Sequence, residues 1–207
     1  MKIIGLTGGI ASGKSTVSKI LKQDFNLPIV DADLIAREIM YPDGEAMKQI
    51  IQEFGMDFIL MDGNLNRPKM GQLISSDLTA KKKLEEITHP LIYKKTKNKF
   101  EYYEAKGKSL IIYDCPLLFE VHQENLVDEI IVVVTQLSTR IERLVARDGI
   151  TEEEAIKKIE IQLEDSYKIE RANTIIYNDG SLEDLAICVR NYGIELKKMQ
   201  IEEKSGK

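Results

Sequence analysis

The feature that most constrains this chain is the run from Gly8 to Ser15, GGIASGKS, which fits the P-loop pattern G-x-x-x-x-G-K-[ST]. An apolar run of strand length precedes it at 2–7, and the apolar residues after it recur at helical spacing. A turn from a strand into a helix brings backbone N–H groups and the positive end of the helix to one point. The run therefore predicts a site for the phosphates of a nucleoside triphosphate.

Each part of this loop has an expected task. Backbone N–H groups surround the phosphate oxygens, the Lys14 ammonium reaches the β and γ phosphates, and the Ser15 hydroxyl binds Mg²⁺. The alternative, a glycine-rich turn that binds nothing, is disfavoured because the motif and both flanking elements agree. The nucleotide-binding residues expected from the loop are Gly8, Gly9, Ile10, Ala11, Ser12, Gly13, Lys14, Ser15 and Thr16.

Size and composition exclude several classes of protein. With 207 residues, 43% of them hydrophobic, the chain has the size of one α/β core rather than two independent domains. The net charge of −5 gives no overall field that favours nucleic acid or an anionic membrane. The first strand starts directly after Met1, so we expect no signal peptide and a soluble, cytoplasmic protein. Cys115 and Cys188 have neither disulfide nor zinc spacing, and their apolar neighbours predict buried, reduced thiols.

Further strands are expected at 27–31, 110–114, 129–134 and 174–177. Continuous apolar runs of this kind are typical of a parallel sheet covered on both faces. The predicted fold is therefore α/β of the P-loop NTPase or kinase type, a three-layer, doubly wound parallel sheet of five strands. Helix starts are expected at Thr151, where T-x-x-E has the form of a capping box, and after Ser181.

A long, mainly helical stretch separates the second and third expected strands. An ordinary crossover needs far less chain, so this insertion is large enough to cover a second substrate. Arg67-Pro68 is expected to open a helix within it, and His89-Pro90 to divide what would otherwise be one very long helix. The predicted single domain comprises a core of 1–42, 108–137 and 170–207, a helical substrate-binding insertion at 43–107, and a helical lid at 138–169.

The lid prediction depends on Arg140, Arg143 and Arg147, which recur at helical spacing and share one helix face. Guanidinium groups grip phosphate oxygens in a way that lysine cannot. A solvated arginine stripe is the alternative interpretation. The position after the fourth strand and before Asp148-Gly149, a flexible break, favours a lid that closes over nucleotide.

Three acidic residues stand at ends of expected strands. Asp31 and Asp33 follow the second strand, at the edge where open α/β sheets bind ligands, so either carboxylate could orient an acceptor hydroxyl. Asp33 could also be only a helix N-cap, and the two roles are compatible. Asp114 ends the third strand as a Walker B acid does and is a candidate Mg²⁺ ligand; the alternative is an ordinary polar strand end.

The two histidines, His89 and His122, belong to no cluster with metal-ligand spacing. His89 could be merely a capping imidazole at a helix end.

Taken together, residues 1–181 resemble the dephospho-CoA kinases. The ordered segments that carry the resemblance are 5–15 (GLTGGIASGKS), 31–37 (DADLIAR), 65–67 (LNR), 84–90 (LEEITHP), 114–120 (DCPLLFE) and 178–181 (NDGS). The resemblance implies ATP-dependent phosphorylation of the ribose 3′-hydroxyl of dephospho-CoA, the last step of coenzyme A biosynthesis, with Mg²⁺ as cofactor.

The resemblance also implies residue roles. Asp33 is the base, assisted by Lys14 and Arg143. The acceptor site comprises Asp33, Arg37, Arg67, His89, Asp114 and Leu117; nucleotide contacts include Arg140, Arg143, Asn178 and Gly180; Ser15 and Asp114 hold the metal. In this chain Arg140 stands where the family often has Gln, and Lys158 where Arg is common.

Three alternative functions compete with this one. Another small-molecule P-loop kinase would share everything except the insertion. A GTP-hydrolysing switch protein is disfavoured because the sequence contains no Asn-Lys-x-Asp guanine-reading segment. The acidic balance and small size disfavour a nucleic-acid motor. The expected partner is thus a small molecule, dephospho-CoA, with neither nucleic acid nor membrane, and the sequence does not specify whether there is a protein partner or which oligomeric state the chain adopts.

Overall fold

The computed structural model describes residues 1–42 and 44–205, with side chains up to residue 200. The chain forms two compact units. The first combines 1–30 with the chain from 103 onward, and the second comprises 31–102.

The first unit is built on a five-stranded parallel sheet, which confirms the predicted fold class. The strand order is β2-β3-β1-β4-β5. The strands are β1 (Lys2–Gly8), β2 (Ile29–Asp31), β3 (Leu110–Asp114), β4 (Glu129–Val134) and β5 (Thr174–Tyr177). In the register, Leu6 pairs with Asp114 and Gly8 with Val133, so the loops that follow β1, β3 and β4 leave the sheet at the same edge.

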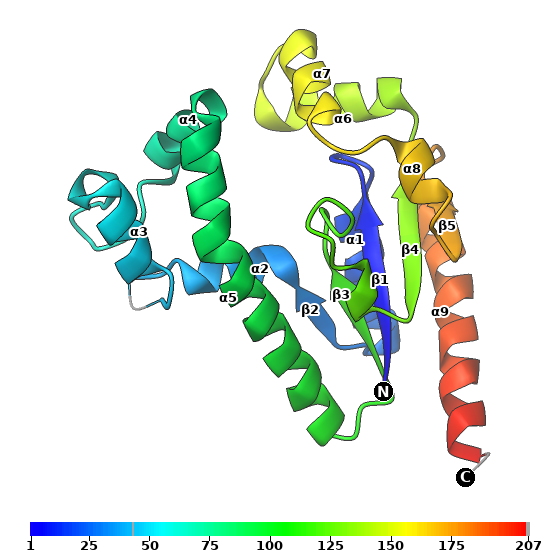
Figure 1. Cartoon of the computed structure of the whole chain (residues 1–207). Coiled ribbons are helices and arrows are strands. Elements are labelled where there is room, and N and C mark those ends of the chain that lie inside the picture. The colour runs from blue at the N-terminus through cyan, green and yellow to red at the C-terminus, as the bar shows by residue number, and fades with distance from the viewer. Residues whose placement is uncertain (43, 206–207) are drawn as a thin grey trace. The chain divides into compact units, whose positions relative to one another are not determined.

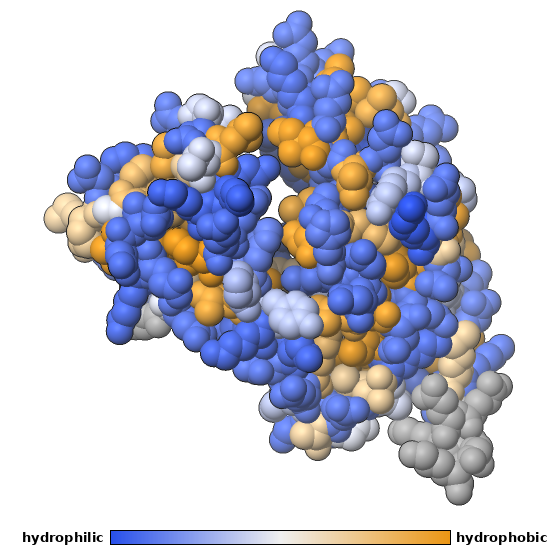
Figure 2. Space-filling model, viewed as in Figure 1, coloured by the Kyte–Doolittle hydropathy of each residue, from blue (hydrophilic) through white to orange (hydrophobic). Residues whose placement is uncertain are grey.

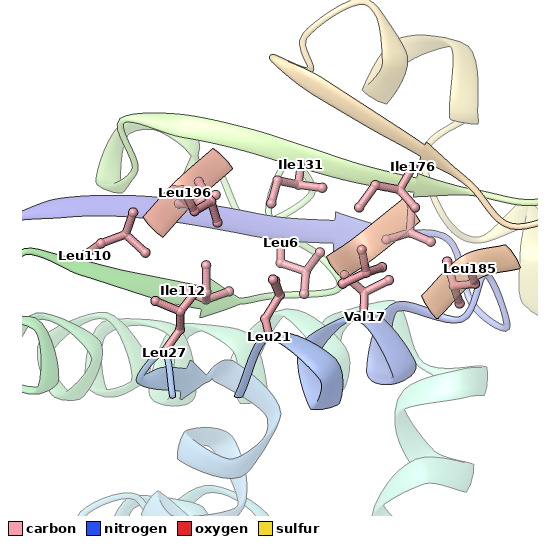
Figure 3. Packing of buried hydrophobic residues seen from close by; sticks show 13 residues of the cluster. Leu6, Val17, Leu21, Leu27, Leu110, Ile112, Ile131, Ile176, Leu185 and Leu196 are labelled. Atoms are coloured by element: carbon pink, nitrogen blue, oxygen red, sulfur yellow. The ribbon is translucent and has the colours of Figure 1, made fainter. Parts of the chain in front are cut away.

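One face of this sheet is covered by α1 (Lys14–Phe25) and α9 (Leu182–Ser205), which pack against each other (Figure 1). Their apolar side chains and those of the strands form the buried cluster shown in Figure 3. The cluster comprises Ile4, Leu6, Val17, Leu21, Leu27, Leu110, Ile112, Ile131, Val133, Ile176, Leu185, Val189 and Leu196.

The opposite face of β1 is covered by the segment after β3. Successive strand residues point to opposite faces, so Gly5 faces away from the cluster that holds Ile4 and Leu6. A Cβ at Gly5 would lie 3.1 Å from Leu118 and 3.2 Å from Val127. Burial on both sides explains why the strands read as continuous apolar runs.

The remaining helices of the first unit follow β4. They are α6 (Leu137–Asp148), α7 (Glu152–Glu160) and α8 (Asp165–Ile169), and the short helix η2 (Glu124–Leu126) precedes β4. The predicted capping box at the start of α7 is confirmed, because Thr151 Oγ1 accepts from the Glu154 N–H and the Glu154 carboxylate accepts from the Thr151 N–H.

The second unit has a helical core of its own. It contains α2 (Ala32–Ile39), α3 (Met47–Phe54), η1 (Met56–Phe58), α4 (Arg67–Ser76) and most of α5 (Leu78–Ala105). The buried cluster at its centre comprises Ile39, Ala46, Met47, Ile50, Leu65 and Met70. Because Ile39 packs there, α2 belongs to this unit, whose bounds differ at both ends from the predicted insertion 43–107.

The prediction that His89-Pro90 divides a helix was wrong. α5 runs from Leu78 to Ala105 with Pro90 inside it. A proline in a helix interior removes one backbone hydrogen bond and costs about 3 kcal/mol. Apolar residues on both sides of it, Ile87 and Leu91 among them, pack on the core of the second unit and offset that cost. His89 is therefore not a helix cap either.

The prediction of two buried thiols was half wrong. Cys115, directly after β3, is buried, whereas Cys188 lies on an exposed position of α9. Both are free. An amphipathic helix exposes one face whatever its local apolar content, and Cys188 falls on that face.

Hydrophilic residues cover most of the molecular face shown in Figure 2. Among the residues that the structure describes, there is no helix with the length and apolar content needed to cross a membrane.

Tyr192 of α9 links the stability of this fold to alkaline pH. It packs against the core cluster, and burial raises the pKa of its hydroxyl to about 12. Above a pH of about 10 the unfolded chain releases this proton while the folded chain retains it, so stability falls as pH rises from about 10 to about 12. We expect Tyr192 to contribute roughly 2 kcal/mol to that fall.

Urea unfolding of Tyr192→Phe should show that the free energy of unfolding falls less steeply with pH above about 10. Tyr177→Phe, at a 60% exposed position, is the control. Equal slopes for the two variants would contradict the assignment.

Candidate nucleotide site

The loop between β1 and α1 has the close backbone packing that the P-loop pattern predicts. Gly13 has φ +94°, a left-handed conformation that favours glycine. A Cβ at Gly13 would lie 2.2 Å from the side-chain nitrogen of Asn178, and a Cβ at Gly9 would lie 2.4 Å from the Arg140 guanidinium. The loop therefore needs glycine because other parts of the first unit press against its backbone.

Two arginines of α6 hold carbonyl groups of this loop. Arg140 Nε donates to the Ile10 carbonyl at 2.9 Å, and Arg143 Nη1 donates to the Ala11 carbonyl at 3.3 Å. These contacts turn the carbonyls toward α6. The Ala11 N–H shares a peptide group with the Ile10 carbonyl and is thereby directed to the other side of the loop, as phosphate binding requires. The Ser12 N–H instead donates to the Gly9 carbonyl at 3.0 Å.

A third carbonyl, that of Ser12, is held from the ends of β4 and β5. Thr135 Oγ1 donates to it at 2.9 Å and Asn178 Nδ2 at 2.8 Å. Asn178 is 3% exposed, so this contact is part of the interior of the unit. The residue predicted as an adenine contact thus also fixes the shape of the P-loop.

Lys14 and Asp114 meet at the sheet edge. The Lys14 ammonium forms an ion pair with the Asp114 carboxylate at the end of β3, and their side chains are 16% and 7% exposed. Ser15, in the first turn of α1, is exposed. Mg²⁺ at nucleotide sites is commonly held by one or two protein oxygens together with phosphate oxygens. The Ser15 hydroxyl and the Asp114 carboxylate offer the oxygen donors that Mg²⁺ prefers, and the described residues hold no group of three or more His, Cys, Asp or Glu side chains arranged for a metal.

The three arginines predicted on one face of α6 have different surroundings. Arg140 is 4% exposed and, besides its bond to the loop, pairs with Asp165 at 2.8 Å. Arg147 is exposed and bonds to Asp148, which Lys158 also contacts at 2.9 Å. The bond from Arg147 is the main cause, and that from Lys158 the second, of a pKa for the Asp148 carboxyl well below its usual range. Arg140 is thus built into the P-loop, whereas Arg147 belongs to a surface ion-pair group.

Sequence reasoning missed several contacts made by residues 162–168, at and after the connection between α7 and α8. The Gln162 side chain accepts the Ile10 N–H at 2.6 Å. Glu120 accepts the Leu163 N–H at 3.1 Å and pairs with Lys168, whose side chain is fully buried, at 3.0 Å. Glu120 lies in a segment that carried the family resemblance, but residues more than forty positions apart give no local signal of contact.

The expected acceptor-site residues lie in the second unit, with two exceptions. Asp33 is in the first turn of α2, Arg37 in its last turn, Arg67 at the start of α4, and His89 inside α5. Asp114 and Leu117, which is 42% exposed, belong to the first unit.

The suggestion that Asp33 caps α2 was wrong. The N-cap is Asp31, whose carboxylate accepts the Leu34 N–H at 2.9 Å. Asp33 lies two residues further on, so its side chain is not required for that cap.

Comparison with known proteins identifies the family. A model of the dephospho-CoA kinase family matches residues 2–184. The chain belongs to the dephospho-CoA kinase family. A dephospho-CoA kinase of Listeria monocytogenes is 44% identical over 182 residues, which cover 88% of this chain and 90% of that protein. One of Bacillus cereus is 37% identical over 196 residues, covering 93% and 98%.

Solved structures give the same result for the fold. The dephospho-CoA kinase of Campylobacter jejuni has a TM-score of 0.74 and 27% identity, covering 97% of this chain and 100% of that chain. The protein TT1252 of Thermus thermophilus also has a TM-score of 0.74, with 31% identity, covering 94% and 97%. The match to a shikimate kinase from Bacteroides thetaiotaomicron, 17% identical, covers 95% of this chain and 98% of that chain, and its TM-score of 0.54 shows a shared fold.

Proposed function

We propose that this protein is a dephospho-CoA kinase that transfers the γ-phosphoryl group of ATP to the ribose 3′-hydroxyl of dephospho-CoA, giving coenzyme A and ADP. The observation that carries the proposal is family membership over residues 2–184, a span that contains both the P-loop and the helical second unit. A chain that matched only at the P-loop could be any of many nucleotide-binding proteins.

The P-loop is the proposed triphosphate site. Phosphoryl transfer passes through a loose transition state, so positioning and electrostatic stabilisation supply most of the catalysis. The loop carbonyls of Ile10 to Ser12 are held by bonds to side chains of α6 and the β4 and β5 ends. The N–H groups of Ala11 and Gly13, which share peptide groups with the Ile10 and Ser12 carbonyls, and the positive end of α1 are thereby directed to the phosphates.

Lys14 and Asp114 exchange partners in this proposal. In the free protein each neutralises the other. With nucleotide bound, the Lys14 ammonium turns to the β and γ phosphates. Asp114 and Ser15 would then hold Mg²⁺, whose positive charge neutralises charge on the phosphate oxygens. The exchange keeps the Asp114 carboxylate paired with a positive charge in both states.

The second unit is the proposed site of the acceptor. Asp33, which is exposed in the first turn of α2, accepts the proton of the ribose 3′-hydroxyl. Arg37, Arg67 and His89 are the proposed acceptor-binding residues of this unit, and Leu117 is a further proposed acceptor contact. Residues 138–169 form the proposed lid, in which Arg143 stabilises the transferring phosphoryl group, and the segment from Asn178 to Gly180 contacts adenine.

A panel of acceptors tests the proposal directly. The protein is incubated with Mg-ATP and, separately, dephospho-CoA, a nucleoside monophosphate, shikimate and gluconate, and products are identified by mass spectrometry. We expect efficient phosphate gain only with dephospho-CoA, and a fragmentation pattern that places it on the ribose. Rapid phosphorylation of another acceptor with dephospho-CoA unchanged would overturn the proposal.

A further inference from the structure

The backbone of Ile10 in the P-loop is held at both its N–H and its carbonyl by side chains of residues 140–162. Its carbonyl accepts from Arg140, which pairs with Asp165, and its N–H donates to the Gln162 side chain at 2.6 Å. Gln162 lies in the short connection between α7 and α8 and is partly buried. The N–H that it occupies belongs to the loop whose N–H groups are proposed to bind phosphate.

Three neighbouring contacts fix the position of Gln162. The Leu163 N–H donates to Glu120, Asp165 pairs with Arg140, and Lys168 pairs with Glu120. Arg140 and Lys168 are buried in the first unit, and Glu120 is held there by its ion pair with Lys168. The connection that carries Gln162 is therefore attached at several points to the nucleotide-binding core, and the Gln162 contact is not that of a free surface side chain.

A primary amide can serve this site both without nucleotide and with nucleotide bound. Its oxygen accepts and its NH₂ group donates, and rotation of the side chain exchanges the two. Only the oxygen can bond to the Ile10 N–H, so in this structure the Gln162 oxygen occupies a donor that an anionic acceptor would also use. Hydrogen bonds to a charged phosphate are roughly twice as strong as those between neutral groups, so a phosphate oxygen would displace the amide oxygen from this N–H.

We propose that Gln162 is a nucleotide-contacting residue: when a phosphate oxygen takes the Ile10 N–H, the Gln162 amide turns and donates its NH₂ group to the phosphates of ATP. This inference rests on the proposed function of the P-loop as the ATP site. It gives the connection between α7 and α8 a direct contact with the phosphates, in addition to the nucleotide contacts expected from the arginines of α6.

A pair of substitutions separates donor from acceptor at this position. Gln162→Glu retains an acceptor for the Ile10 N–H but has no donor for phosphate, whereas Gln162→Lys retains a donor and has no acceptor. Ile161→Glu and Ile161→Lys place the same charges one residue away, on a side chain that is 77% exposed, and measure the effect of charge alone. ATP affinity is measured by titration calorimetry for all four variants, and Ile10 amide exchange is measured in the nucleotide-free proteins.

We expect Gln162→Glu to weaken ATP binding by about 10-fold or more, as for loss of a hydrogen bond to a charged group, and Gln162→Lys to bind ATP at least as well as the parent. The difference in ATP affinity between Gln162→Glu and Gln162→Lys should clearly exceed the difference between the two Ile161 variants. In the free protein, Ile10 exchange should accelerate in Gln162→Lys and stay slow in Gln162→Glu. This exchange result checks the contact without any activity measurement.

Three outcomes would overturn the proposal. If Gln162→Glu retains ATP affinity and Gln162→Lys loses it, Gln162 only braces the loop. If ATP affinity differs as much between Ile161→Glu and Ile161→Lys as between Gln162→Glu and Gln162→Lys, only the charge matters. If Gln162→Ala binds ATP more tightly than the parent, the side chain merely obstructs the site. Failure of the parent protein to phosphorylate dephospho-CoA counts instead against the proposed function, because the ATP-binding and exchange results do not depend on the acceptor.

Discussion

Replacement of Asp33 by Asn is expected to lower turnover by about 10²- to 10⁴-fold with little loss of stability, because an amide cannot accept the proton of the acceptor hydroxyl. The structure removes the competing explanation, since the N-cap of α2 is Asp31. Loss of one negative charge from the first turn of a helix costs no more than about 1 kcal/mol. Turnover is measured with saturating ATP and dephospho-CoA, and stability by urea unfolding.

Asp31→Asn is the matched control for this experiment. Asn caps helices about as well as Asp, so this variant should retain both stability and activity. ATP binding by Asp33→Asn should be unchanged, because the P-loop contacts do not involve α2. Full activity of Asp33→Asn together with a loss in Asp31→Asn would move the base to Asp31 and overturn the assignment.

Replacement of Lys14 by Ala is expected to lower both turnover and stability. Removal of a positive group aimed at charge that develops in the transition state typically costs about 10²- to 10³-fold in turnover. The same substitution leaves the Asp114 carboxylate, 7% exposed, without its ion-pair partner. Loss of one partner from a buried pair destabilises a protein by about 3 kcal/mol or more. The measurements are kinase turnover and the midpoint of urea unfolding.

A double substitution separates the two effects. In Lys14→Ala/Asp114→Asn no buried carboxylate remains unpaired, so most of the lost stability should return. Turnover should stay low because this variant lacks both Lys14 and the proposed Mg²⁺ ligand Asp114, and Asp114→Asn alone measures the share of that loss that comes from Asp114. If turnover recovered along with stability, Lys14 would act by holding the fold rather than by contacting phosphate. Normal turnover in folded Lys14→Ala would contradict the assignment outright.

Features that depend on neighbouring residues could be predicted from the sequence. The P-loop pattern located a strand, a turn and a helix correctly because the glycines meet local backbone demands, such as the left-handed φ of Gly13. The capping box at Thr151 and Glu154 was predicted for the same reason, since both of its hydrogen bonds span three residues. Apolar runs located all five strands, because a parallel strand buried on both faces contains few polar residues.

Local patterns failed where tertiary packing outweighed them. Pro90 is a strong helix-breaking signal, yet the apolar face of α5 packs on the second unit and the helix continues. The position of the α2 cap depended on whether the helix began after Asp31 or after Asp33, and helix ends are the least predictable part of an element. Cys188 has apolar neighbours in the sequence but lies on the outer face of α9.

The sequence by itself determined the parallel sheet, the phosphate-binding loop and, through the family resemblance, the reaction. Only the tertiary structure decided which side chains hold that loop in shape. Thr135, Asn178, Arg140 and Gln162 contact the loop from positions more than a hundred residues away. Such contacts arise when the chain closes long loops around the sheet, and no spacing or periodicity within a short window encodes them.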